Sequence, residues 1–169
     1  MSKTLIIAEH DGQNLNPSTA KCASCAAAIG HDFDIVVMGT SIGDIAGQAA
    51  AIDGAGSVIS IDAEHLANPL AVNHAAEVVA LADNYSHILG PSTTYGRDLM
   101  PRIAALLGVN QVSDISAVEG THQFKRPIYA GNAIVDVHAP ESAKLVATVR
   151  VASWTAAGSL SLIHISEPT

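Results

Sequence analysis

The hydrophobic residues of the chain recur in short continuous runs, each followed by a longer alanine-rich stretch. The runs have the length of buried strands and lie at residues 4–8, 33–38, 57–61 and 86–89. The stretches have helical length and lie at residues 17–29, 44–52, 69–82 and 95–107. Continuous apolar runs, in contrast to alternating ones, are typical of parallel strands covered by helices on both faces. The pattern therefore predicts repeated β-α units with right-handed crossovers.

Capping residues mark several of the predicted helix ends. Asn16 is a good N-cap and Pro17 fits a first helical turn, while Gly30 and Gly108 lie where helices commonly end. Pro101 falls inside the last stretch, where a proline removes a helical hydrogen bond. Either that helix begins near residue 100, after a loop or short turn, or it is kinked at Pro101; we favour the first.

After Gly108 the helical pattern stops. Further apolar runs lie at residues 112–118, 121–126, 128–137 and 144–151. Because no helix intervenes, we expect these strands to pair antiparallel, as hairpins at one edge of the sheet. The predicted fold is α/β: a Rossmann-like three-layer sandwich with a mostly parallel sheet and an antiparallel C-terminal strand extension.

Composition narrows the function classes. The 169 residues suit one domain, and 49% hydrophobic residues argue against disorder. A net charge of −8 without any basic run argues against nucleic-acid binding. No apolar run is long enough to cross a bilayer, so membrane insertion is not expected. The apolar run directly after Lys3 is too short for a signal peptide, and the two cysteines indicate a reducing compartment, so we expect the cytoplasm.

The sharpest catalytic pattern is Gly-Thr-Ser-Ile-Gly at residues 39–43, which fits a nucleophile elbow around Ser41. A hydrolase also needs a later acid and histidine, for which Asp114 with His122, or with His138, are available. We favour a glycine-rich turn required for tight packing. A small serine hydrolase remains an alternative, and otherwise no catalytic residue is predicted.

Other motifs are weaker. Cys22 and Cys25 lie well inside a predicted helix, so we interpret them as small buried side chains and not as a redox pair. Neither a dinucleotide fingerprint nor a P-loop occurs, and the histidines have no metal-ligand spacing, so no metal site is expected.

Two polar groups follow predicted strands, at the edge where open α/β sheets bind ligands. Glu-His-Asp at residues 9–11 follows the first strand and is either a site or a salt-bridged corner. The loop with Ser92, Thr93 and Thr94 opens a helix, and Arg97 follows; these four residues are the candidates for binding an anion. A stand-alone adenine-nucleotide-binding domain that uses this loop is a second alternative, although serine and threonine also cap helices without any ligand.

Four segments, in this order and spacing, are more informative than any single motif. They are residues 5–10 (LIIAEH), 95–105 (YGRDLMPRIAA), 113–115 (SDI) and 126–133 (RPIYAGNA). Through them the chain resembles the N-terminal domain of the electron transfer flavoprotein alpha subunit, from about residue 3 to residue 158. The resemblance implies an adenine nucleotide alpha hydrolase-like variant of the predicted fold.

The resemblance also implies a function for the whole protein. It would be one subunit of a heterodimer with a beta subunit, and would take electrons from flavin dehydrogenases, such as the acyl-CoA dehydrogenases of fatty-acid β-oxidation. It would pass them to a membrane quinone oxidoreductase, as an electron carrier and not an enzyme. In the family, FAD is held mainly by a C-terminal domain, and the AMP site belongs to the beta subunit. No cofactor is therefore expected on this fragment.

The resemblance fixes the expected domain boundaries. Residues 1–158 form the N-terminal domain, and the FAD-binding domain is missing. Residues 159–169 (SLSLIHISEPT) match nothing in the family, and we interpret them as a foreign or disordered tail on a naturally longer chain. In a eukaryote the compartment would be the mitochondrial matrix, although no transit peptide is visible.

Overall fold

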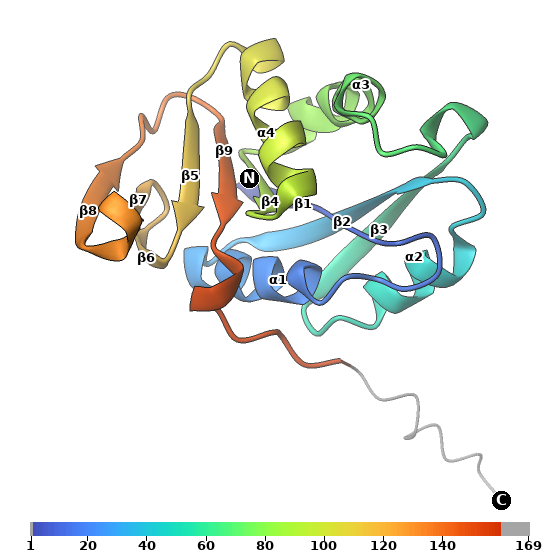
Figure 1. Ribbon diagram of the computed structural model, residues 1–169, viewed down its shortest axis with the longest axis horizontal. Coiled ribbons are helices and arrows are strands. Elements are labelled where there is room, and N and C mark those ends of the chain that lie inside the picture. Colours follow the sequence, from blue (N-terminus) through green and yellow to red (C-terminus); the bar gives the residue numbers. More distant parts are fainter. Residues whose placement is uncertain (1, 160–169) are drawn as a thin grey trace, which may run out of the picture.

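A central parallel sheet organises the computed structural model, which describes residues 2–159 (Figure 1). The strand order is β3-β2-β1-β4-β9-β5, and all five neighbouring pairs are parallel. The strands are β1 (Lys3–Ile7), β2 (Asp32–Gly39), β3 (Ala55–Asp62), β4 (His87–Pro91), β5 (Gln111–Ile115) and β9 (Leu145–Val149).

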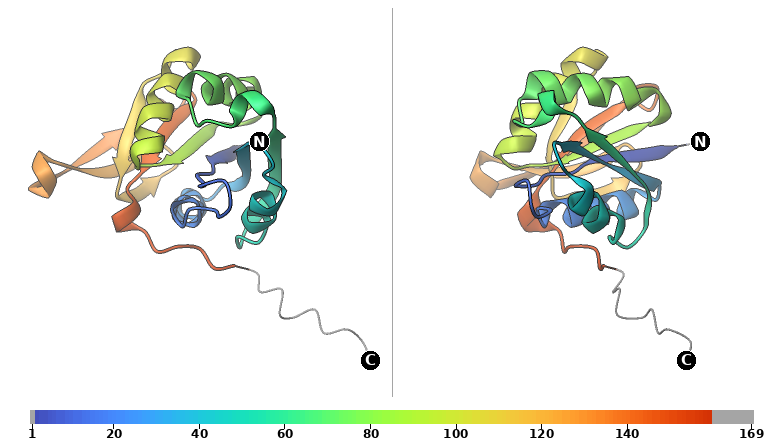
Figure 2. Two further views of the ribbon diagram at one scale, coloured as in Figure 1. Left: turned by 45° about the vertical axis from the view of Figure 1, so that its right-hand side comes forward. Right: turned by 90° about the vertical axis from the view of Figure 1, so that its right-hand side faces the viewer.

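Helices cover both faces of this sheet, as the views in Figure 2 show. They are α1 (Ser18–Ile29), α2 (Gly43–Ala50), α3 (Ala71–Leu81) and α4 (Thr94–Leu107), with short 3-10 turns η1 (Glu64–Leu66), η2 (Ala82–Asn84), η3 (Tyr129–Gly131) and η4 (Val151–Ser153). Successive strand residues point to opposite faces. Thus Ile6 belongs to the core with α1 and α2, and Leu5 and Ile7 belong to the core with α3 and α4. The predicted three-layer α/β architecture is confirmed.

The C-terminal region differs in part from its prediction. Strands β6 (Ala117–Gly120), β7 (Gln123–Ile128) and β8 (Ala133–His138) pair antiparallel as expected, but they form a separate small sheet. The expectation that β9 is antiparallel is wrong, because it lies between β4 and β5 and runs parallel to both. All five residues of β9 are buried and all but Thr148 are apolar, and such a strand belongs inside a sheet covered on both faces. The small sheet serves as the crossover between β5 and β9.

The start of α4 also differs from its prediction. The helix begins at Thr94 and not near residue 100, and Pro101 lies in its interior. The N-cap Thr93 accepts a hydrogen bond from the N–H of Gly96 (3.3 Å). Leu99, among other residues of the first two turns, is buried against the sheet. Capping and burial thus fix the first turns and outweigh the hydrogen bond that a proline removes.

The chain after β9 returns beneath α1 and α2. The indole Nε1 of Trp154 donates to the carbonyl oxygen of Ile115 (3.0 Å), and the N–H of Asp53 donates to the carbonyl oxygen of Gly158 (2.8 Å). Ser159 forms an isolated antiparallel bridge with Ile52. The predicted foreign tail lies, apart from Ser159, outside the described residues.

One close backbone approach joins α4 to the end of β4. Gly96 is buried, and a Cβ atom at this position would overlap the carbonyl oxygen of Pro91. Because the obstacle is backbone, no side-chain rotation can relieve it. By contrast, a Cβ atom on Gly43, the first residue of α2, would meet nothing within 4 Å.

We expect Gly96→Ala to lower the free energy of unfolding by at least about 3 kcal/mol, the upper range for over-packing. Gly43→Ala, the matched control, should change it by less than about 1 kcal/mol, since alanine is the better helix former. Urea denaturation of both variants measures the difference. Equal stabilities would show that α4 does not need this close contact.

Candidate functional site

The sheet reverses its strand order between β1 and β4, so their carboxyl ends flank the crevice where open α/β sheets bind ligands. The two polar groups predicted from the sequence meet here. Thr93 Oγ1, after β4, donates to Glu9 Oε2, after β1, over 2.8 Å. The same carboxylate oxygen accepts from Ser18 Oγ at the start of α1 (3.4 Å).

This arrangement makes the crevice unfavourable for a phosphate. A phosphate at the switch point would lie against the first turn of α1, where the helix dipole favours an anion. Glu9 places the protein's own carboxylate beside Ser18 in that turn. A second anion there would be repelled. On the side that faces β1, the loop of residues 92–94 therefore makes structural contacts through Thr93, with Glu9 and with the first turn of α4.

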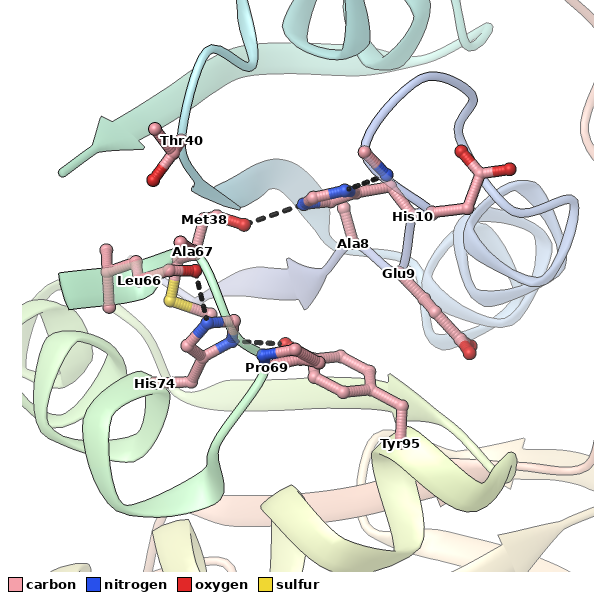
Figure 3. A pocket seen from close by; sticks show the side chains of 12 residues that line it. Ala8, Glu9, His10, Met38, Thr40, Leu66, Ala67, Pro69, His74 and Tyr95 are labelled. Atoms are coloured by element: carbon pink, nitrogen blue, oxygen red, sulfur yellow. Dashed lines mark hydrogen bonds between the residues drawn. The ribbon is translucent and has the colours of Figure 1, made fainter. Parts of the chain in front are cut away.

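A cavity of about 300 Å³ opens beside the crevice (Figure 3). Its polar side chains include Glu9, His10, Asp11, His74 and Tyr95. His10 Nε2 donates to the carbonyl oxygen of Met38 (2.7 Å), and its Nδ1 accepts from the N–H of Gly12 (3.1 Å). Both ring nitrogens of His10 are therefore occupied.

The second histidine of this cavity is held in the same way. The Tyr95 hydroxyl donates to His74 Nδ1 (2.8 Å), and His74 Nε2 donates to the carbonyl oxygen of Leu66 (3.4 Å). Burial lowers the pKa of His74 and raises the pKa of Tyr95. Both groups stay uncharged at neutral pH and are committed to structural hydrogen bonds. The cavity therefore offers no free general base from its histidines.

Asp11, which also lines this cavity, is part of a turn. Asp11 Oδ1 accepts from the N–H groups of Gln13 (2.9 Å) and Asn14 (2.7 Å). These hydrogen bonds, that of Asn14 first, lower the pKa of Asp11. Of the two sequence interpretations of residues 9–11, a structural corner fits these contacts, although hydrogen bonds rather than salt bridges hold it.

Ser41 has the left-handed backbone of a nucleophile elbow, with φ 56°. However, the N–H groups of Ser41 and Ile42 donate to the two oxygens of Asp62 (3.0 and 3.2 Å). In an elbow, the N–H after the nucleophile stabilises an oxyanion. A carboxylate at that position would repel an oxyanion instead. The geometry therefore does not support the serine hydrolase alternative.

The glycines of this turn have different roles. A Cβ atom on Gly39 would lie 2.8 Å from Ile42 Cγ2, so the predicted tight packing is confirmed at that position. Gly43 and Gly47 have open space where a Cβ would lie, so tight packing does not explain them. These glycines build no close cradle, and the turn does not fit the diphosphate of FAD.

The predicted catalytic partner His122 lies far from Ser41. Its ring contacts that of His87 (centroids 4.9 Å apart), and His87 is the first residue of β4. Ser41 follows the carboxyl end of β2, and the two strands run in the same direction. Ser41 and His122 therefore lie at opposite ends of the parallel strands. Asp114 is likewise engaged elsewhere, with Arg150 Nη1 at 4.0 Å.

His122 instead belongs to a cluster that attaches the small sheet to the domain. The rings of His31 and His122 pack edge-on against His87. His87 Nε2 donates to the carbonyl oxygen of Thr121 (2.6 Å), and Nδ1 accepts from Ser86 Oγ (2.8 Å). Burial, with smaller effects of the two neighbouring histidines, lowers the pKa of His87 to about 4.

The predicted anion loop divides between two roles. Thr93 caps α4, Thr94 is its exposed first residue, and Ser92 Oγ accepts from Arg97 Nε (3.3 Å). Ser92 and Arg97 line a second cavity, of about 670 Å³, on the side away from Glu9. Sequence reasoning missed its other two basic residues, Arg126 on β7 and Arg150 after β9, because they come from separate parts of the chain and share no spacing signal.

The two cysteines have the predicted structural role. Cys22 and Cys25 are buried in α1 as free thiols. Burial raises the pKa of Cys22 and raises that of Cys25 to about 12. Neither thiol is poised for redox chemistry.

Among residues 2–159, no group of three histidine, cysteine, aspartate or glutamate residues could hold a metal ion. None of the helices in this part of the chain is long and apolar enough to cross a membrane.

Comparison with known proteins gives a consistent family. Residues 4–162 match the model of the electron transfer flavoprotein domain. The chain is 39% identical to the electron transfer flavoprotein subunit alpha of Pseudomonas aeruginosa over 97% of its own length and 54% of that protein. It is 42% identical to the alpha subunit of Paracoccus denitrificans over 91% of its own length and 50% of that protein. It is 33% identical to the mitochondrial alpha subunit of Dictyostelium discoideum over 98% of its own length and 50% of that protein. The chain thus spans about half the length of the curated relatives it matches.

We expect the histidine cluster to make the protein less stable as the pH is lowered. The folded pKa of His87 (about 4) is below its ordinary value of 6.5, so on acidification the unfolded chain takes up the proton first. The contribution is complete above about pH 6.5 and is lost towards pH 4. It amounts to about 3 kcal/mol, of which about 2 kcal/mol is lost by pH 5.

Urea denaturation at about pH 7.5 and pH 5 measures this loss. His87→Gln should reduce the pH dependence, and the exposed His138→Gln should leave it unchanged. A full pH dependence in His87→Gln would contradict the assignment.

Proposed function

Because the chain belongs to the electron transfer flavoprotein family, we propose that it is the N-terminal scaffold and subunit-docking domain of an alpha subunit. The observation that supports a scaffold is the commitment of its polar groups. Glu9 at the ligand crevice, and His10 and His74 in the cavity beside it, are all engaged in structural hydrogen bonds. A domain that positions other parts of an electron carrier needs no acid, base or nucleophile of its own.

The whole protein, in this proposal, is an electron carrier and not an enzyme. It takes electrons from flavin dehydrogenases, such as those that act on acyl-CoA, and delivers them to a membrane quinone oxidoreductase. FAD supplies the redox chemistry when bound. Sequence beyond this chain holds most of that cofactor, in line with the half-length match to the relatives. The compartment we propose is the bacterial cytoplasm, since bacterial relatives are 39–43% identical and mitochondrial ones 33–34%.

The small antiparallel sheet is the surface that we assign to beta-subunit docking. It lies at one end of the molecule (Figure 1). Ile134 on β8 is 57% exposed and Tyr129 before it is 79% exposed, two of the largest exposed apolar surfaces among residues 2–159. Exposed aromatic and aliphatic side chains on a projecting element are typical of interfaces.

We expect Ile134→Asp to weaken association with a bacterial electron transfer flavoprotein beta subunit by at least about tenfold, since a buried charge replaces an apolar contact. Val72→Asp is the matched control, because Val72 is similarly exposed (52%) but lies on α3. Sedimentation velocity of mixed subunits measures both affinities. Equal weakening, or none, would remove the small sheet from the interface.

A second prediction concerns the cofactor. The purified chain should be colourless, because in this proposal FAD is held mainly by sequence beyond this chain. An absorption spectrum tests this directly. Stoichiometric flavin absorbance that persists through purification would place FAD binding in this domain, against the proposal.

A further inference from the structure

The second cavity, here called the arginine cavity, gathers basic residues from distant parts of the chain. Its basic side chains are Arg97 on α4, Arg126 on β7 and Arg150 after β9. These are three of only eight lysines and arginines in a chain of net charge −8. Such a concentration of positive charge runs against the overall charge of the protein, so it calls for a local explanation.

The described residues neutralise little of this charge. Asp114 is the one acidic residue that lines the cavity, and its contact with Arg150 is long, at 4.0 Å. Within residues 2–159, no carboxylate lies within 4.0 Å of Arg97 or Arg126. Arg126 Nε is buried and has no hydrogen-bond partner in the same part of the chain. A buried donor without an acceptor is costly, so contacts among the described residues do not explain the placement of this guanidinium.

The backbone around the arginine cavity is strained. The described chain has four non-glycine residues with positive φ, and three of them line this cavity: Asp114 (63°), Tyr129 (50°) and Ala130 (53°). Such residues cost of order 1–3 kcal/mol each and cluster where a ligand or partner is held. The strain here positions the turn of residues 129–131, whose tyrosine ring is 79% exposed at the rim.

We propose that the arginine cavity binds a phosphoryl group, as inorganic phosphate or diphosphate or as the phosphates of a nucleotide. Three guanidinium groups and one carboxylate leave two positive charges to be matched. A phosphate carries close to two negative charges and three acceptor oxygens, whereas a carboxylate carries one charge and is satisfied by a single arginine. The exposed ring of Tyr129 at the rim offers a surface on which a base can stack.

This site is distinct from the crevice that Glu9 fills. It shares Tyr129 with the proposed docking surface, but its test uses the chain alone and does not depend on docking. It retains two of the four predicted anion candidates, Ser92 and Arg97, and adds Arg126 and Arg150. Three of the four segments that carry the family resemblance contribute to it, through Arg97, Asp114 and residues 126–131. The segments that identify the family therefore converge on one cavity.

Isothermal titration calorimetry of the 169-residue chain with sodium phosphate, sodium diphosphate, ADP and adenosine tests the proposal. We expect diphosphate and ADP to bind more tightly than adenosine, and added salt to weaken both. ADP binding well above diphosphate binding would assign the site to a nucleotide, and equal binding would assign it to the free anion. Arg126→Gln should weaken diphosphate binding by about tenfold, the loss expected for one charge-assisted hydrogen bond.

Arg102→Gln is the matched control, since Arg102 is an exposed arginine on α4 that does not line the cavity. It should bind diphosphate as the unaltered chain does. Thermal unfolding of each variant without ligand shows whether it is folded, and Arg97→Gln at the exposed helix surface serves if Arg126→Gln is not. The proposal is overturned if no phosphate compound binds at about 10 mM. It is equally overturned if adenosine alone accounts for ADP binding, if succinate binds as tightly as diphosphate, or if Arg102→Gln weakens binding as much as Arg126→Gln.

Discussion

The carboxylate of Glu9 links the elements that meet where the strand order of the sheet reverses, between β1 and β4. It accepts hydrogen bonds from Thr93, which caps α4, and from Ser18, which opens α1. Helices from opposite faces of the sheet are thus fixed to the end of one strand by one side chain. The same contact decides what the edge of the sheet can bind. In an open α/β sheet the switch point is the natural ligand crevice, and here an internal anion takes the place that a phosphate would otherwise have.

Once this crevice is filled, the remaining polar chemistry lies to either side of it. On the β2 side, His10 and His74 spend both ring nitrogens on neighbouring backbone and hydroxyl groups. On the β9 side, Arg126 keeps a buried donor without an acceptor among the described residues. The two cavities share an edge of the sheet but differ in kind. Both histidines of the first have all their ring nitrogens hydrogen-bonded, and the second holds a buried donor without an acceptor among the described residues.

The sequence predicts those features of the fold that depend on short stretches of the chain. Continuous apolar runs predicted the parallel strands β1 to β4, and the helical position of Cys22 predicted its burial. The predictions for the start of α4 near Pro101 and for the direction of β9 were wrong because tertiary contacts determine both. The cap at Thr93 and the buried face of α4 override the proline, and the place of β9 depends on a gap between β4 and β5 that no sequence window contains. The arginine cavity was half predicted for the same reason: Arg97 follows a loop with an anion-binding pattern, but Arg126 and Arg150 reach the cavity only through the fold.

The late insertion of β9 has a consequence for synthesis. The strand sits between β4 and β5, yet it follows both in sequence by some thirty residues or more. As the chain leaves the ribosome from its N-terminus, β4 has a neighbour on one side and β5 has none until residue 149 has emerged. During that interval the buried strand β4 and the half-buried strand β5 present unpaired backbone, which is a template for association with other chains. The small antiparallel sheet is complete by then, because its three strands are consecutive and close through local turns. Its early folding shortens the connection between the end of β5 and the start of β9, and so reduces the time for which the sheet lacks β9.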